Sequence, residues 1–178
     1  MKTKDDDKYA RIIDATTALI LAQGAAAVST TQVAKKVGIA QSNIYLYFEN
    51  KDDLLLQTLT TQQARVQAYF DGRFDSLAPL VAQLHQYIDL LAGFAVAEPG
   101  ALTVIDQIKQ LPGTPAEHPE ALFAAPLVTA GIKAGLLRDL PPELHLTVIF
   151  NVIRHWAQLK PRPEFAQVHA MIWAAVAK

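Results

Sequence analysis

Gly38 lies between two short segments whose apolar residues recur at helical spacing. Glycine allows the chain to turn back sharply at this point, because it has no Cβ atom to restrict the backbone. The residues that would pack between the two segments are small or branched and apolar: Val33, Ala34, Val37, Ile39 and Ile44. Two short helices joined by a tight turn and fixed by such a core form a helix-turn-helix. The sequence therefore predicts this unit at residues 30–48, with its second helix from about residue 41 to 48.

The rest of the chain also has helical character. Its composition is 51% hydrophobic, with alanine and leucine prominent and β-branched residues only in short runs, which favours helices. Glycines and prolines divide the apolar patterns into about nine predicted helices, at about residues 8–23, 30–37, 41–48, 51–70, 76–97, 101–110, 119–134, 142–160 and 163–177. We therefore expect an all-α protein with a three-helix head, residues 1–50, and a helical body, residues 51–178.

The charge balance excludes a nucleic-acid binder that relies on its overall field. The chain has a formal net charge of −1, and residues 1–53 contain seven basic and seven acidic side chains. A neutral head gains little from long-range attraction to phosphates. Any DNA binding must therefore come from a local, shaped surface.

Several other classes of function are disfavoured by what the sequence lacks. It has no cysteine and none of the short patterns of zinc hydrolases, phosphate-binding loops or serine hydrolases. Its five histidines, at positions 85, 118, 145, 155 and 169, have no metal-site spacing. We expect no enzyme, no metal and no cofactor. No apolar run reaches the ~18 residues of a membrane span, and the N-terminus has no apolar signal segment, so we expect a cytoplasmic protein with no membrane partner.

The second helix of a helix-turn-helix enters the major groove with its N-terminal residues toward the base edges. Here those residues are Gln41, Ser42 and Asn43. Glutamine and asparagine can pair bidentately with adenine, and serine can donate or accept a hydrogen bond. The pattern alone also fits an ordinary helical hairpin, so the residues beyond it decide between the two.

Those residues resemble the signature of the TetR family of transcriptional regulators. The family shows a glycine, an aliphatic-Tyr-x-Tyr/His-Phe stretch, and a lysine followed by an acid and a leucine. The matching residues are Gly38, Ile39, Ile44, Tyr45, Tyr47, Phe48, Lys51, Asp52 and Leu54. Upstream, residues 12–15, Gly24 and residues 31–34 lie at the family's spacing, so the resemblance covers about residues 9–55.

The resemblance implies DNA contacts for the matched positions. Thr30 and Thr31 would contact phosphate, and either Tyr45 or Tyr47 would place its phenol on the DNA backbone. Tyr47 is the expected exposed phenol, since Tyr45 fits the core equally well. Lys51 would bind phosphate at the start of the next helix, a role that also follows from the attraction of anions to helix N-termini.

Two positions depart from the family pattern. Ser42 stands where glycine is frequent, and Leu46 stands where histidine, asparagine or arginine is frequent. Leu46 would either touch a thymine methyl group or pack against the head. The family's base preference therefore cannot be transferred to this chain.

The resemblance also implies that the body dimerises and binds a small effector. The helices predicted at 142–160 and 163–177 are apolar on more than one face, which fits either a two-fold four-helix interface or a large monomeric core. The interface candidates are Ile149, Val152, Trp156, Val168 and Ile172. The effector-binding candidates are Tyr69, His85, Phe94, Gln107, Phe123, His155 and Trp156. No charged cluster accompanies them, so we expect a mostly apolar ligand.

These expectations combine into one function. We expect a TetR-like homodimeric repressor of a palindromic operator in double-stranded DNA, released by a small, mostly apolar molecule. The alternative is a coactivator or adaptor with the same fold that acts through protein contacts, which the neutral charge of the head leaves open.

Overall fold

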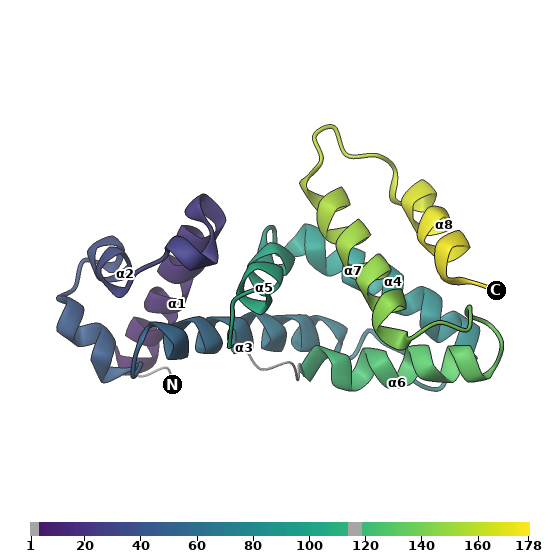
Figure 1. Ribbon diagram of the computed structural model, residues 1–178, viewed down its shortest axis with the longest axis horizontal. Coiled ribbons are helices and arrows are strands. Elements are labelled where there is room, and N and C mark those ends of the chain that lie inside the picture. The colour runs from purple at the N-terminus through teal and green to yellow at the C-terminus, as the bar shows by residue number, and fades with distance from the viewer. Residues whose placement is uncertain (1–3, 114–118) are drawn as a thin grey trace. The chain divides into compact units, whose positions relative to one another are not determined.

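The computed structural model describes residues 4–113 and 119–178. Over these ranges it contains eight α-helices, two 3-10 helices and a single isolated bridge between Leu137 and Ala177 (Figure 1). The helices form two compact units, which are described separately: unit 1 holds residues 4–64 and 103–113, and unit 2 holds residues 65–102 and 119–178. The prediction of an all-α fold is confirmed.

Unit 1 is built around a small apolar core. Its elements are α1 (Lys4–Gln23), η1 (Ala25–Ala27), α2 (Thr30–Val37), η2 (Gln41–Leu46), the first part of α3 (Lys51–Phe70) and most of α5 (Ala101–Lys109). The helix α1 packs on α2 and η1, and α2 packs on η2. Almost no surface remains exposed on the largest of their shared core residues: Ile12, Ile13, Ile20, Val33, Ile44 and Phe48.

The turn between α2 and η2 forms as the sequence predicts. The helix α2 begins at a capping box, in which Ser29 Oγ accepts from Gln32 N and Gln32 Oε1 accepts from Ser29 N at 2.9 Å. It ends at Gly38, whose φ of 79° is left-handed. Glycine reaches that conformation without strain because it has no Cβ atom.

The second helix of the pair differs from the prediction. It is a 3-10 helix over Gln41–Leu46, not an α-helix reaching Phe48. Its first backbone bond joins Asn43 N to Ala40 O, and Tyr47 N closes onto Ile44 O. Both bonds span three residues, which tightens the backbone to three residues per turn.

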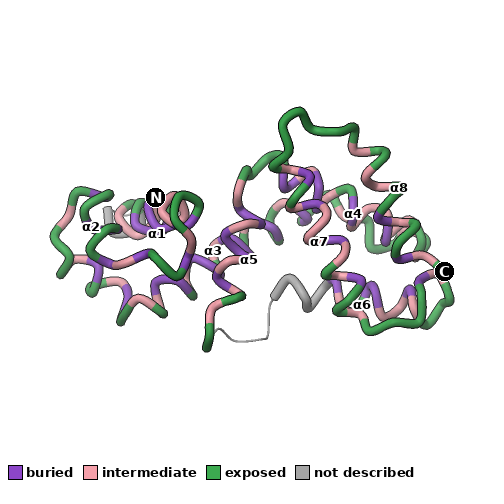
Figure 2. Tube along the Cα trace, turned by 45° about the horizontal axis from the view of Figure 1, so that its top comes forward, coloured by how far each residue is buried: buried purple, intermediate pink, exposed green. Residues whose placement is uncertain are grey.

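Unit 2 consists of α4 (Leu80–Ala97), α6 (Pro119–Lys133), α7 (Pro142–Gln158), α8 (Phe165–Val176) and the second part of α3. The helix α4 packs on α6 and α7, and α7 packs on α6 and α8. By length and composition α4 is also the one helix among the described residues that is apolar enough to cross a membrane. In this bundle it buries Leu84, Ile88 and Phe94. Figure 2 shows the chain coloured by burial.

The compact units do not divide the chain at residue 50. The helix α3 stays with unit 1 up to Ala64, and α5 joins it from Thr103. Gln107 of α5 accepts a hydrogen bond from the backbone N–H of Ala25 at 3.0 Å through its Oε1 atom. The turn that follows α1 is therefore held by a residue more than eighty positions further along the chain.

Candidate nucleic-acid interface

The outer surface of η2 carries the side chains predicted to read DNA bases. Gln41 and Ser42 are exposed and Asn43 is half-buried. Tyr45 is 50% exposed and Leu46 is 75% exposed. These five residues, which we call the η2 face, combine hydrogen-bonding groups with one fully apolar side chain.

A hydroxyl network fixes part of the η2 face on α2. Thr30 Oγ1 lies 3.2 Å from Tyr45 Oη, and Gln41 Nε2 donates to Thr30 Oγ1 at 3.1 Å. Gln41 Nε2 is also 3.4 Å from Tyr45 Oη. Thr30 itself is buried, and its hydroxyl makes hydrogen bonds inside unit 1. The prediction was a contact from this residue to a DNA phosphate. Thr31, the next residue, is exposed.

Tyr45 lies in η2 and Tyr47 follows its last residue. The order of their exposure is the reverse of the expected one. Tyr45 presents its phenol to solvent, whereas Tyr47 is half-buried with its ring centroid 6.3 Å from that of Phe48. The expectation that Tyr47 is the more exposed phenol is therefore wrong. Ile44 and Phe48 are buried as predicted.

Lys51 is the first residue of α3, and its side chain reaches back to η1. Its Nζ atom donates to the backbone carbonyl of Ala26 at 2.7 Å. Asn50 caps the same helix by accepting from Asp53 N at 2.9 Å, and Asp53 Oδ2 accepts from Glu49 N at 2.9 Å. An ammonium group has three N–H donors, so the bond to Ala26 leaves others for an anion.

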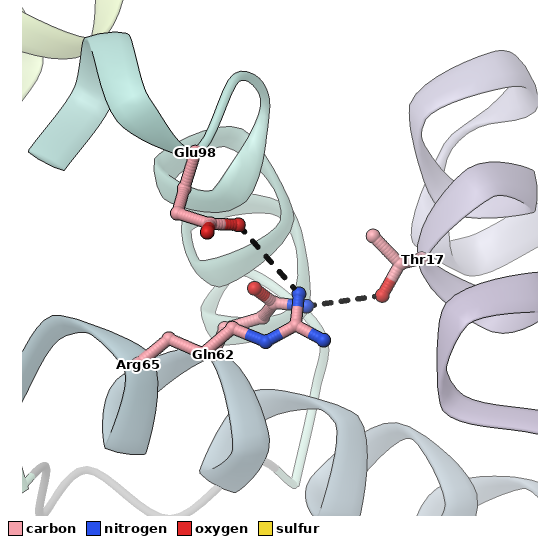
Figure 3. A network of polar contacts seen from close by, with 4 residues as sticks. All are labelled: Thr17, Gln62, Arg65 and Glu98. Carbon is pink, nitrogen blue, oxygen red and sulfur yellow. Dashed lines mark hydrogen bonds and ion pairs between the residues drawn. The ribbon is translucent and has the colours of Figure 1, made fainter. Parts of the chain in front are cut away.

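The sequence did not predict that α3 contains two buried glutamines. Gln62 is fully buried and Gln63 is 5% exposed. Gln62 Nε2 donates to Thr17 Oγ1 at 3.0 Å (Figure 3), but Gln62 Oε1 and Gln63 Nε2 have no hydrogen-bond partner among the described residues. A buried polar atom without a partner is costly. The only sequence signal was a pair of adjacent glutamines in a helix that also contains apolar core residues such as Leu59 and Val66. Figure 3 also shows the ion pair of unit 2 between Arg65 and Glu98, at 3.8 Å.

The predicted effector-binding residues fall into separate places. Tyr69 and Phe94 meet in unit 2 with their ring centroids 5.8 Å apart, and Phe94 is fully buried. His155 is exposed on α7. Gln107 belongs to unit 1, where it binds Ala25 as described above. The side chain of Phe123 lies outside the described residues.

Two neighbouring clefts of unit 2 involve the remaining candidates. One, of about 440 Å³, is lined by His85, Asp89 and Phe165 with two further residues of α8. The other includes Asp89 and Phe165 together with Trp156. Within the described part of the chain no group of three or more histidine, aspartate or glutamate side chains could hold a metal ion.

Three of the five interface candidates lie in the core of unit 2. Ile149, Trp156 and Ile172 are 2%, 7% and 0% exposed, and Trp156 Nε1 donates to Pro163 O at 2.9 Å. These three side chains therefore pack inside unit 2 and are not open to a partner. Val152 and Val168 are half-buried. The exposed apolar surface of α7 and α8 comprises other residues: Leu144, Ala166, Ala170, Met171, Ala174 and Ala175.

Comparison with known proteins identifies the head. The family model of bacterial regulatory proteins of the TetR family matches residues 12–58, the segment that contains the second part of α1, then η1, α2, η2 and the start of α3. An uncharacterised HTH-type transcriptional regulator of Haemophilus influenzae is 30% identical over 112 residues, 63% of this chain and 60% of that protein. This chain therefore spans about three fifths of the length of that curated relative.

Solved structures extend the similarity to the whole chain. A candidate transcription regulator from Lactobacillus plantarum is 36% identical with a TM-score of 0.81, over 96% of this chain and 98% of that chain. A TetR family transcription regulator from Marinobacter aquaeolei VT8 is 26% identical with a TM-score of 0.81, over 100% of both chains. Head, body and residue pattern thus agree, and the chain belongs to the TetR family of bacterial regulatory proteins.

Proposed function

We propose that the protein is a homodimeric repressor in the cytoplasm that binds a palindromic operator in double-stranded DNA and is released by a small, mostly apolar effector. The observation that carries the proposal is the η2 face. Its exposed Gln41 and Ser42 and its half-buried Asn43 begin the second helix of the helix-turn-helix, the part of this motif that reads base edges.

In this proposal, phosphate contacts position the head and base contacts specify the sequence. Thr31, Tyr45 and Lys51 supply the phosphate contacts. Thr30 takes a different role, because its buried hydroxyl holds Tyr45 and Gln41 in place. With a neutral head, these few placed groups supply the attraction that a basic patch supplies elsewhere.

The proposed dimer is formed by the exposed apolar surface of α7 and α8. Leu144 is 51% exposed and Met171 is 55% exposed, and the alanines around Met171 would allow a partner helix to approach closely. A two-fold axis through this surface would present two heads to successive major grooves, which is why the operator is proposed to be palindromic.

The effector is proposed to bind in unit 2. The two clefts beside α8 bring His85 and Trp156 next to the same pair of residues, Asp89 and Phe165. Ligand sites combine mostly apolar walls with a few polar groups. The cleft that includes Trp156 fits that description, since Asp89 is its one charged residue, whereas the cleft of about 440 Å³ adds two polar side chains, His85 and His169, to Asp89. The effector would act by binding more tightly to the conformation in which the heads no longer match the operator.

The test is selection from a library of random-sequence duplexes with the full chain. We expect enrichment of an inverted repeat that the wild type binds with an affinity that falls steeply as salt rises. Asn43→Ala should lose ~1–3 kcal/mol and relax the preference at one position of each half-site. Lys51→Ala should weaken all sequences about equally and reduce the salt dependence.

Lys133→Ala is the matched control for Lys51→Ala. Lys133 is an exposed lysine on α6. Its substitution removes the same charge outside the head and should leave DNA binding unchanged. If no duplex is enriched, or if Asn43→Ala binds the enriched duplex like the wild type, the proposed groove contact is wrong. A chain without any DNA footprint would favour the alternative of an adaptor, which the neutral head leaves open.

A further inference from the structure

Leu46 is the most exposed of the large apolar side chains of unit 1. It is 75% exposed, compared with 50% for Tyr45 and 43% for Leu21. A leucine that packed against the head would be largely removed from water, because burial of such a side chain is worth about 1.5–3 kcal/mol. Packing therefore does not account for its position at the end of η2.

The 3-10 geometry of η2 places Leu46 beside a base-reading side chain. With three residues per turn, side chains three positions apart lie above one another, so Asn43 and Leu46 share a side of the helix. The same rule puts Gln41 with the buried Ile44, in agreement with the bond from Gln41 to Thr30 of α2. In an α-helix, Asn43 would lie between residues 46 and 47 on one face, so the 3-10 geometry aligns it with Leu46 more directly.

The apolar part of this surface is small. It consists of Leu46 and the ring of Tyr45, and the other members of the η2 face are the hydrogen-bonding residues Gln41, Ser42 and Asn43. The DNA major groove has the same composition, since its base edges offer donors and acceptors with one apolar substituent, the C5-methyl group of thymine. A second protein would more commonly require a broader apolar patch.

We propose that Leu46 contacts a thymine C5-methyl group in the major groove, next to the base pair that Asn43 reads. The inference rests on the proposed DNA binding and adds a specificity-determining residue to it. Because this contact needs no hydrogen bond, Leu46 distinguishes thymine from the other bases by one methyl group.

The experiment is a double-mutant cycle on the duplex enriched by the full chain. Each thymine is replaced in turn by deoxyuridine, which removes only the methyl group, and Kd is measured by fluorescence anisotropy at fixed salt. One position in each half-site should weaken wild-type binding about fourfold, the effect of one buried methyl group. Leu46→Ala should bind the thymine and deoxyuridine duplexes equally at that position.

Leu21→Ala is the matched control, since Leu21 is an exposed leucine of the same unit on α1. It should keep the full fourfold response to deoxyuridine. The inference is overturned if Leu46→Ala keeps that response too, or if no thymine responds although the duplex is bound. Failure to enrich any duplex would overturn both this inference and the proposed function, so the two failures are distinguishable.

Discussion

The Nδ1 atom of His85 on α4 lies 3.2 Å from the Nε2 atom of His169 on α8. The two rings are stacked with centroids 5.0 Å apart, and the His85 ring is 4.0 Å from that of Trp173. The same Nε2 atom of His169 lies 3.7 Å from a carboxylate oxygen of Asp89. One ring must donate and the other accept, so the hydrogen bond requires at least one neutral imidazole.

This contact predicts a loss of stability in mild acid. Burial, followed by the charge of His169, lowers the pKa of His85 below its usual 6.5, although Asp89 acts in the opposite direction. The unfolded chain then binds more protons than the folded chain as the pH falls through 6.5 toward the lowered value, so the free energy of unfolding decreases there. The stability lost in this way is fully present above pH 6.5.

Thermal denaturation between pH 7.5 and pH 5.5 checks this expectation. The Tm of the wild type should fall with pH, and His85→Gln should reduce the dependence. His155→Gln changes an exposed histidine of α7 and should keep the wild-type dependence. If His85→Gln is as sensitive to acid as the wild type, the pair does not couple stability to pH.

A side chain at Gly93 of α4 would meet the phenol of Tyr69. A Cβ atom there would lie 2.6 Å from Tyr69 Oη, while the next atoms of that ring are 3.4 and 3.5 Å away. Gly93→Ala should therefore destabilise the protein by ~1–3 kcal/mol, the usual cost of overpacking, as measured by urea denaturation. Combining it with Tyr69→Phe removes the clashing oxygen and should recover most of the loss. Equal instability of the single and double variants would refute this cause.

The proposed dimer surface is tested with a charge at Met171. Because Met171 is 55% exposed, Met171→Glu should leave the fold intact and separate the subunits, as measured by light scattering after gel filtration. Leu77→Glu places the same charge on a leucine of unit 2 that is 94% exposed and should remain dimeric. A dimeric Met171→Glu variant with normal operator affinity would place the interface elsewhere.

The sequence predicted the elements of unit 1 better than their orientation. Apolar spacing and Gly38 were sufficient for the turn between α2 and η2, because both act over a few residues. The exposure of Tyr45 was missed, since it depends on whether η2 turns every 3.6 residues or every three. That choice is made by backbone hydrogen bonds such as Tyr47 N to Ile44 O, which apolar spacing does not reveal.

Longer-range contacts explain the other differences. Ile149 and Ile172 were assigned to a partner because α7 and α8 are apolar on more than one side, but the pattern does not tell which side faces the core of the chain itself. Gln107 was assigned to the effector site because the family resemblance implies a pocket lined by the central helices of the body. Its bond to Ala25 joins residues 82 positions apart, and no local pattern encodes such a pairing.

The bond from Ala25 N–H to Gln107 also limits how this regulator can be recombined with its relatives. The helix α5 supplies Val104, Ile105 and Ile108, all buried, to a unit that otherwise ends at residue 64. A chimera that exchanged only an N-terminal segment would leave the host's α5 against a foreign η1 turn. The DNA-binding head therefore cannot be transferred as one continuous segment. A graft requires that two separate stretches of chain be exchanged together.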